Sequence, residues 1–428
     1  MAPRTSKAVA VLLFKGRVFA MNGERPGPGV NFALPFTILG MAKTLDICIR
    51  GGGIVGHTLA LLLARERLRV GLVAPAASQA GARSDVRAYA LNQKSRELLQ
   101  GLRCWPDAPH VSAVLDMHVK ETGAGRVSFS AAQYRVPALA WIVDVPALES
   151  QLAEAVRFAP QIEMLDAAQR ATLTVVCEGH ASASRQQFGA DLDVTAYPQW
   201  AIAARVHCET PHLQAARQWF TPGDILGFLP LEGEHGNSMA VVWSVDEARK
   251  TELLEASPEV FANKLQQASE NQFGRLTLSS ERAAWPLQLA LAPHWCGVSD
   301  GQAWVLAGDA AHTVHPLAGQ GLNLGLADVR ELASLIHGRD YWREVNDEKM
   351  LRRYERARKA DVALMGAATD GLQQLFSRAG PQWRSVRNWG MNGFERSGLL
   401  KRWVVRQAMG MDATPRSTET ETEGTGAR

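Results

Sequence analysis

The sequence predicts an α/β fold in which a Rossmann-like βαβ domain carries an inserted, mostly antiparallel β domain and is followed by C-terminal helices. Three observations lead to this prediction. A glycine-rich turn joins an alternating strand to an apolar helix near residue 51. A second strand, turn and glycine-rich helix start follow near residue 308. Between these units, long segments alternate apolar and polar residues, as the strands of a half-buried sheet do.

The first unit begins with Leu45–Arg50, which alternates apolar and polar residues and is predicted to be a strand. A G-x-G-x-x-G motif follows, with its glycines at Gly51, Gly53 and Gly56. A helix over about 55–67 and a strand over 68–73 complete the βαβ unit, which is the setting that this motif needs to bind a dinucleotide. An acid often closes the second strand to bind a ribose hydroxyl, but Ala74 stands there.

The second unit begins with a short apolar run, Gln302–Ala307, that is predicted to be a buried strand. Gly308 and Asp309 follow, and a Gly-Gln-Gly turn leads into a helix predicted to start near Gln320. A carboxylate at this place can accept hydrogen bonds from sugar hydroxyls, and the free N–H groups at a helix start favour negative charge. We therefore expect Asp309 to bind a ligand rather than only cap a turn.

The rest of the chain divides by its periodicity. Trp200–Val206 and Met239–Trp243 alternate in period two, a long helix is predicted over 347–375, and 414–428 is polar and rich in Thr and Glu. The predicted parts are a discontinuous dinucleotide-binding domain (41–110, 135–190 and 290–330), an inserted substrate domain (111–134 and 191–289), a C-terminal helical region (331–411) and a disordered tail (412–428).

Composition excludes several classes of protein. The 428 residues can bury a large core, and their hydrophobic fraction of 46% is ordinary for an enzyme. The net charge is only +3, which does not support a basic surface for binding nucleic acid. The five cysteines are scattered and form no C-x-x-C pair, which indicates a reducing compartment. No apolar run reaches the roughly 18 residues of a transmembrane helix.

Residues 1–40 are expected to lie outside the fold, because the regular pattern begins just after Met41. The favoured interpretation is that Met41 is the true first residue. A basic, acid-poor targeting segment and a disordered arm are the alternatives.

The two motifs together resemble those of the FAD-dependent aromatic hydroxylases of the para-hydroxybenzoate hydroxylase class, and most of all the ubiquinone-biosynthesis hydroxylase family. The resemblance extends over about 45–411. The long run 308–325 is its most specific part. Supporting segments are 85–91, 178–185, 209–212, 229–231, 369–372 and 406–410.

This resemblance implies a glutathione-reductase-like FAD domain and hydroxylation of an aromatic ring. FAD would be the cofactor, NAD(P)H and O2 the co-substrates, and a flavin hydroperoxide the oxygen donor. The cofactor contacts that it implies are Gly51, Gly53, Gly56, Arg87, Glu178, Gly179, Gly308, Asp309, Gly319, Gln320, Gly321, Leu322 and Asn323. Glu178 stands where the family has Asp. No separate NAD(P)H domain is visible.

Histidines raise further possibilities. His315 and Pro316 would lie beside the flavin and are the candidate catalytic residues. A metal site at His312 and His315 is disfavoured, because no third ligand has matching spacing. His212 or Tyr197 could polarise a phenol on the substrate side.

The expected function is hydroxylation of a prenylated ring in quinone biosynthesis, in the cytoplasm or peripherally at the inner face of the membrane. The basic, partly apolar stretch 384–406 would contact an anionic membrane or a quinone-biosynthesis complex. Two alternatives stay open. One is a monooxygenase of another phenol. The other is a weakly flavinated scaffold subunit, favoured by Ala74, Glu178 and the short 144–178 segment.

Overall fold

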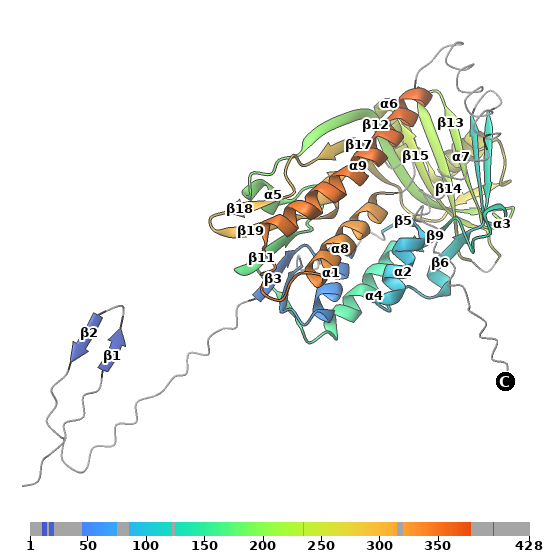
Figure 1. The fold of residues 1–428 in the computed structure, drawn as a ribbon. Helices are drawn as coiled ribbons and strands as arrows, with labels where there is room; N and C mark the ends of the chain where they lie inside the picture. The colour runs from blue at the N-terminus through green and yellow to red at the C-terminus, as the bar shows by residue number, and fades with distance from the viewer. Residues whose placement is uncertain are drawn as a thin grey trace, which may run out of the picture. The chain divides into compact units, whose positions relative to one another are not determined.

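The computed structural model describes residues 11–14, 17–20, 45–74, 85–121, 125–233, 235–314, 320–377 and 397. The chain divides into two units, residues 1–43 and 44–428. In the first unit, β1 (Val11–Phe14) and β2 (Arg17–Ala20) pair as an antiparallel hairpin that the sequence analysis did not predict. The site and its supporting elements all belong to the second unit (Figure 1).

The predicted α/β fold class is confirmed. A six-stranded sheet has the order β10-β4-β3-β11-β19-β18, with only β18 antiparallel to its neighbour. Its central strands bury most of their residues, as expected of strands that are covered on both faces. The strands are β3 (Leu45–Arg50), β4 (Val70–Val73), β10 (Ile162–Leu165), β11 (Ala171–Val176), β18 (Cys296–Ser299) and β19 (Gln302–Leu306).

Helices cover this sheet and form its core with it. Helix α1 packs against α4 and α8, and α8 packs against α9 (Figure 1). Helix α1 ends two residues earlier than predicted, because Arg67 has a left-handed φ of 59°. The helices are α1 (Ile54–Arg65), α2 (Gln93–Gly101), α4 (Val145–Arg157), α5 (Ala183–Gln187), α8 (Gly321–His337) and α9 (Glu348–Ser377).

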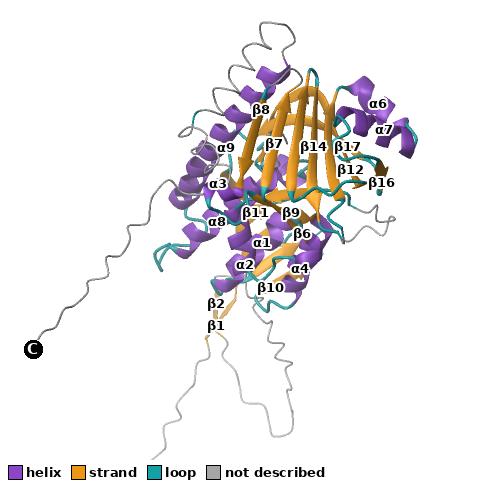
Figure 2. Cartoon of the chain, turned by 90° about the vertical axis from the view of Figure 1, so that its right-hand side faces the viewer, coloured by secondary structure: helices purple, strands orange, loops and turns teal. Residues whose placement is uncertain are grey.

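A nine-stranded sheet forms the second layer, with helices α6 (Glu247–Glu255) and α7 (Pro258–Ala268) beside it (Figure 2). Its order is β20-β17-β12-β15-β14-β13-β7-β8, with β16 on β12, and all pairs except β13 with β7 are antiparallel. The strands are β7 (Asp116–Glu121), β8 (Arg126–Ser130), β12 (Asp193–Cys208), β13 (Ala215–Thr221), β14 (Asp224–Leu231), β15 (Ser238–Val245), β16 (Leu276–Leu278), β17 (Ala283–Leu291) and β20 (His312–Thr313); the short helix α3 (Ala131–Tyr134) follows β8.

A three-stranded sheet joins the two layers. It consists of β5 (Ala88–Leu91), β9 (Ala140–Asp144) and β6 (Val111–Val114), in the order β5-β9-β6. The side chains of β5 alternate: Ala88 and Ala90 pack on the cluster shared with the nine-stranded sheet, and Tyr89 packs on the core of the six-stranded sheet. Strand β5 is therefore positioned between the two layers.

Candidate functional site

The glycine-rich turn after β3 has two tight glycines and one open one. Gly51 has a φ of 119°, and a Cβ there would lie 2.3 Å from the carbonyl oxygen of Cys177. A Cβ on Gly56 would lie 1.9 Å from the carbonyl oxygen of Gly51. A Cβ on Gly53 would meet nothing within 4 Å. Two glycines thus close the helix onto the sheet, and Gly53 leaves a free approach to the start of α1.

That open approach fits the pyrophosphate of a dinucleotide. Gly53 precedes the first residue of α1, its side chain position is exposed, and no acidic residue stands in the first turn. A helix start with free N–H groups and no acidic residue in its first turn favours an anion. Within its own loop, the His57 ring bonds the Gly53 carbonyl at 3.0 Å. The start of α1 therefore has room for an anionic group, which is what the sequence prediction of a dinucleotide site requires.

The second predicted unit forms the turn that holds Asp309. Gly308–Ala310 is a short 3-10 helix, η2, directly after β19, and Gly308 has a φ of 64°. The Asp309 side chain is exposed to solvent, yet burial among surrounding protein atoms raises its pKa. His312, His180 and Arg87 lower that pKa in part. A carboxylate that is both accessible and partly desolvated is typical of the wall of a ligand cleft.

Helix α8 begins at Gly321 with Gln320 as its N-cap, as predicted. A Cβ on Gly321 would meet nothing within 4 Å, so the start of this helix is open as well. Leu322 is buried. Gly319 and the candidate catalytic residues His315 and Pro316 lie outside the described residues.

Asn323 is bound to protein groups. Its Oδ1 accepts from the backbone N–H of Asn92 at 3.0 Å and from Ser95 Oγ at 2.7 Å, and its Nδ2 donates to the Ala90 carbonyl at 2.8 Å. The amide therefore ties the start of α8 to β5 and α2. Its predicted contact with a cofactor stays a prediction.

Arg87 directly precedes β5 and forms a close ion pair with Asp85. Its Nε bonds both carboxylate oxygens of Asp85, at 2.9 and 3.0 Å. The hydrogen bond with Asp85 is the main reason that the pKa of Arg87 lies above its ordinary value. The charge of Arg87 also acts on Asp309, which places the two residues in one neighbourhood.

Glu178 is engaged by its own loop. Its carboxylate accepts from Ser182 Oγ at 2.7 Å, from Ser184 Oγ at 2.6 Å and from the backbone N–H of Ser184 at 3.0 Å. Burial would raise the pKa of Glu178, but these hydrogen bonds from Ser184 and Ser182 leave it below its ordinary value. The structure therefore gives Glu178 a local role, and Gly179, with a φ of 81°, has open space in front of it.

The sequence analysis missed a buried ion network behind Asp309. Asp328 on α8 contacts His312 and Arg358, and all three side chains are buried. A signal was present, since an Asp among the apolar residues of an amphipathic helix must have partners. His312 is thus engaged by Asp328, and the described residues contain no cluster of three His, Cys, Asp or Glu arranged for a metal ion.

His212 does not fit the proposed role toward a phenol. It is buried; its Nε2 lies 2.9 Å from the carbonyl oxygen of Leu231, and its Nδ1 accepts from the N–H of Gln214 at 3.0 Å. With both ring nitrogens occupied, this side chain fixes the turn between β12 and β13.

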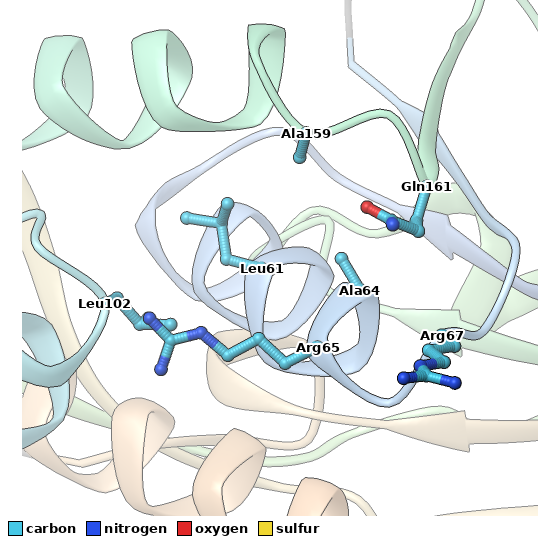
Figure 3. A pocket seen from close by; sticks show the side chains of 7 residues that line it. All are labelled: Leu61, Ala64, Arg65, Arg67, Leu102, Ala159 and Gln161. Carbon is cyan, nitrogen blue, oxygen red and sulfur yellow. The ribbon is translucent and has the colours of Figure 1, made fainter.

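A surface hollow of about 390 Å³ lies at the other end of α1 (Figure 3). It is lined by Leu61, Ala64, Arg65, Arg67, Leu102, Ala159 and Gln161. Helix α1 rises by about 18 Å over its length, so this hollow is far from the glycine-rich turn at the helix start. We place the candidate site at the glycine-rich turn and Asp309, because a Cβ on Gly308, the neighbour of Asp309, would lie 3.3 Å from Val55 at the start of α1.

Comparisons with known proteins show the family of this chain. The family model described as an FAD binding domain matches residues 160–368. The chain is 31% identical to the 3-demethoxyubiquinol 3-hydroxylase of Escherichia coli, over 86% of this chain and 98% of that protein. It is 29% identical to the ubiquinone hydroxylase UbiL of Rhodospirillum rubrum, over 86% of this chain and 90% of that protein.

A solved structure shows the same fold. The p-nitrophenol 4-monooxygenase PnpA of Pseudomonas putida superimposes with a TM-score of 0.66 at 17% identity, covering 86% of this chain and 98% of that one. The identity to the Escherichia coli protein over nearly its full length shows the family. This chain belongs to the FAD-dependent monooxygenase family that includes the ubiquinone-biosynthesis hydroxylases.

Proposed function

We propose that this protein hydroxylates the aromatic ring of a prenylated intermediate of ubiquinone biosynthesis, with NAD(P)H and O2 as co-substrates. The observation that carries the proposal is the 31% identity to a protein named 3-demethoxyubiquinol 3-hydroxylase, 98% of which the chain matches. The similarity to UbiL, named a ubiquinone hydroxylase, supports the same substrate class.

The residues of the site suit FAD, which when bound supplies the redox chemistry that side chains lack. The open position at Gly53 and the free N–H groups of α1 would hold the pyrophosphate. Asp309 would accept hydrogen bonds from sugar hydroxyls. The start of α8 at Gly321 is a second place where N–H groups favour negative charge, worth about 0.3–1 kcal/mol at an exposed helix end.

An apolar cluster beside β5 supports an apolar substrate. Val114, Ile142, Ala216, Leu231 and Ala240 form its buried part, between the three-stranded and nine-stranded sheets. Other members, such as Ala90, Met117 and Leu229, are only half-buried. A prenylated ring needs apolar walls of this kind, with few polar groups.

Contact with a membrane or a biosynthetic complex through 384–406, and a cytoplasmic location, remain proposals from the sequence, because that stretch lies outside the described residues apart from Ser397. No helix in the described part of the chain has the length and apolar character needed to cross a bilayer.

Complementation tests the proposal. A strain lacking a ubiquinone-biosynthesis hydroxylase would receive this chain or its Gly53→Glu variant, and quinones would be measured by mass spectrometry. We expect the parent chain to convert the accumulated precursor into a product with one more oxygen atom. Accumulation of the precursor despite FAD-loaded protein would refute the substrate class. Restoration by Gly53→Glu would instead show that the active enzyme does not bind its cofactor at Gly53.

A further inference from the structure

The carboxylate of Asp328 is a buried centre to which three residues donate hydrogen bonds. The side chain is fully buried on α8. It accepts from the backbone N–H of Gly308 at 2.9 Å, from His312 Nε2 at 2.6 Å and from Arg358 Nε at 2.7 Å. Burial would raise the pKa of Asp328, but His312 and Arg358 hold it below its ordinary value. A buried charge is tolerated only with partners of this kind.

Arg358 extends this centre to the C-terminal helix α9. Its guanidinium also donates to Asp361 at 2.5 Å and to the Leu324 carbonyl at 3.4 Å, so it joins α9 to α8. The side chain is buried, and removing it would leave the negative charge of Asp328 with fewer donors. Such a loss is costly, because the remaining charge stays desolvated.

The same carboxylate fixes both ends of the segment Gly308–His312. At one end, Gly308 has a left-handed φ of 64°, and its N–H is directed at Asp328. At the other end, the His312 ring is held by Asp328 and stacks on Trp295, with ring centroids 5.1 Å apart. Asp309 stands between these two fixed points and faces solvent.

We propose that Asp328 and Arg358 are positioning residues for the cofactor. Through their buried hydrogen bonds they hold Gly308–His312 in the conformation in which the Asp309 carboxylate would accept hydrogen bonds from the sugar hydroxyls of FAD. Helix α9 thereby belongs to the cofactor site, although Arg358 acts through Asp328 and Gly308. The inference rests on FAD binding and not on the identity of the substrate.

A double-mutant cycle on the full-length holoenzyme tests this role. FAD dissociation constants would be measured by flavin fluorescence for Arg358→Met, Asp309→Asn and the double variant, at a temperature where urea unfolding shows each chain folded. We expect Arg358→Met to weaken FAD binding by about tenfold or more in the parent. In the Asp309→Asn background the same change should have an effect of about twofold or less, because it acts through Asp309.

Arg356→Met is the matched control. Arg356 lies on the same helix, and its side chain is exposed to solvent. We expect it to alter FAD affinity by about twofold or less. An equal loss of affinity from Arg358→Met in both backgrounds, or none in the parent, would overturn the proposal.

Arg358→Lys keeps the positive charge next to Asp328 and replaces Arg358→Met in the cycle if that chain does not fold. We expect Arg358→Lys to weaken FAD binding in the parent by less than Asp309→Asn does. An equal loss of affinity from Arg358→Lys in the parent and in the Asp309→Asn background would contradict the proposal. A parent chain that retains no FAD would count against cofactor binding itself and would be recognised before any variant is compared.

Discussion

The two halves of the candidate site are built in opposite ways. The turn Gly51–Gly56 is held by steric fit, since its tight contacts are with the backbone of Cys177 and with the turn itself. The second half is held by hydrogen bonds and charge: Asp328, which pairs with Arg358, bonds Gly308, and Asn92 and Ser95 bond Asn323.

This difference determines how each half should respond to mutation. In the first half, Gly51 and Gly56 have no room for a side chain, whereas Gly53 does. Mutations at the two tight glycines should therefore affect the fold, and mutations at Gly53 should affect ligand binding. In the second half, hydrogen bonds and charge carry the geometry, so changes outside the ligand contacts should alter affinity. The second half also holds the carboxylate of Asp309, which is partly desolvated. A residue that is needed for FAD binding should therefore lower the stability of the FAD-free chain.

Gly53→Glu should have the largest effect on cofactor content. The open space at Gly53 accommodates a side chain, so the chain should fold with a stability within about 1 kcal/mol of the parent. A carboxylate at the helix start would then repel the pyrophosphate and abolish FAD retention. Flavin absorbance of the purified variant measures this, with Gly53→Ala as the control that should retain FAD. Normal flavin content in Gly53→Glu would refute the placement of the cofactor.

Gly51→Val should instead destabilise the fold. The added Cβ would lie 2.3 Å from a backbone oxygen at a φ of 119°, so strain and overpacking should cost about 3 kcal/mol or more. Urea unfolding of the FAD-free chain measures this loss. If Gly51→Val were as stable as Gly53→Ala, then Gly51 would not be the sterically restricted position described above.

Asp309→Asn should weaken FAD binding by about ten- to a hundredfold, because hydrogen bonds to a charged group are lost. It should also stabilise the FAD-free chain at neutral pH. The folded-state pKa of Asp309 is raised, so its contribution to stability is present below the unfolded pKa and is lost as pH rises through the folded pKa. The advantage of the variant should therefore grow with pH from about 4 upward. Thermal unfolding across that range checks the sign, and a variant less stable than the parent at pH 7 would contradict it.

Of the four substitutions discussed, Asn323→Ala should have the smallest overall effect on stability and FAD binding. It removes the amide that bonds Ala90, Asn92 and Ser95, which should cost about 1–3 kcal/mol of stability. FAD affinity should fall less than in Asp309→Asn, because these bonds join protein groups. Urea unfolding and FAD titration measure the two effects, and a larger loss of affinity than in Asp309→Asn would assign Asn323 a direct cofactor contact.

Most of the fold could be predicted from the sequence, because local patterns encode it. The strand Leu45–Arg50, the start of α8 next to Gln320 and the long helix α9 all follow from periodicity and turn residues. The partners of Asp328, and those of Asn323 on β5 and α2, could not be predicted, since they lie 16 to 233 residues away along the chain. Glu178 was assigned to the cofactor by resemblance, whereas its nearest donors are the serines of its own loop.

Flavin stoichiometry of the purified chain tests the central claim most directly. The visible absorption spectrum would be recorded after adding excess FAD and removing the unbound fraction, for the parent and for Gly53→Glu. The account predicts about one FAD per chain in the parent and none in the variant, with both folded. A folded parent without flavin, or equal flavin in both, would contradict a cofactor site built from Gly53 and Asp309.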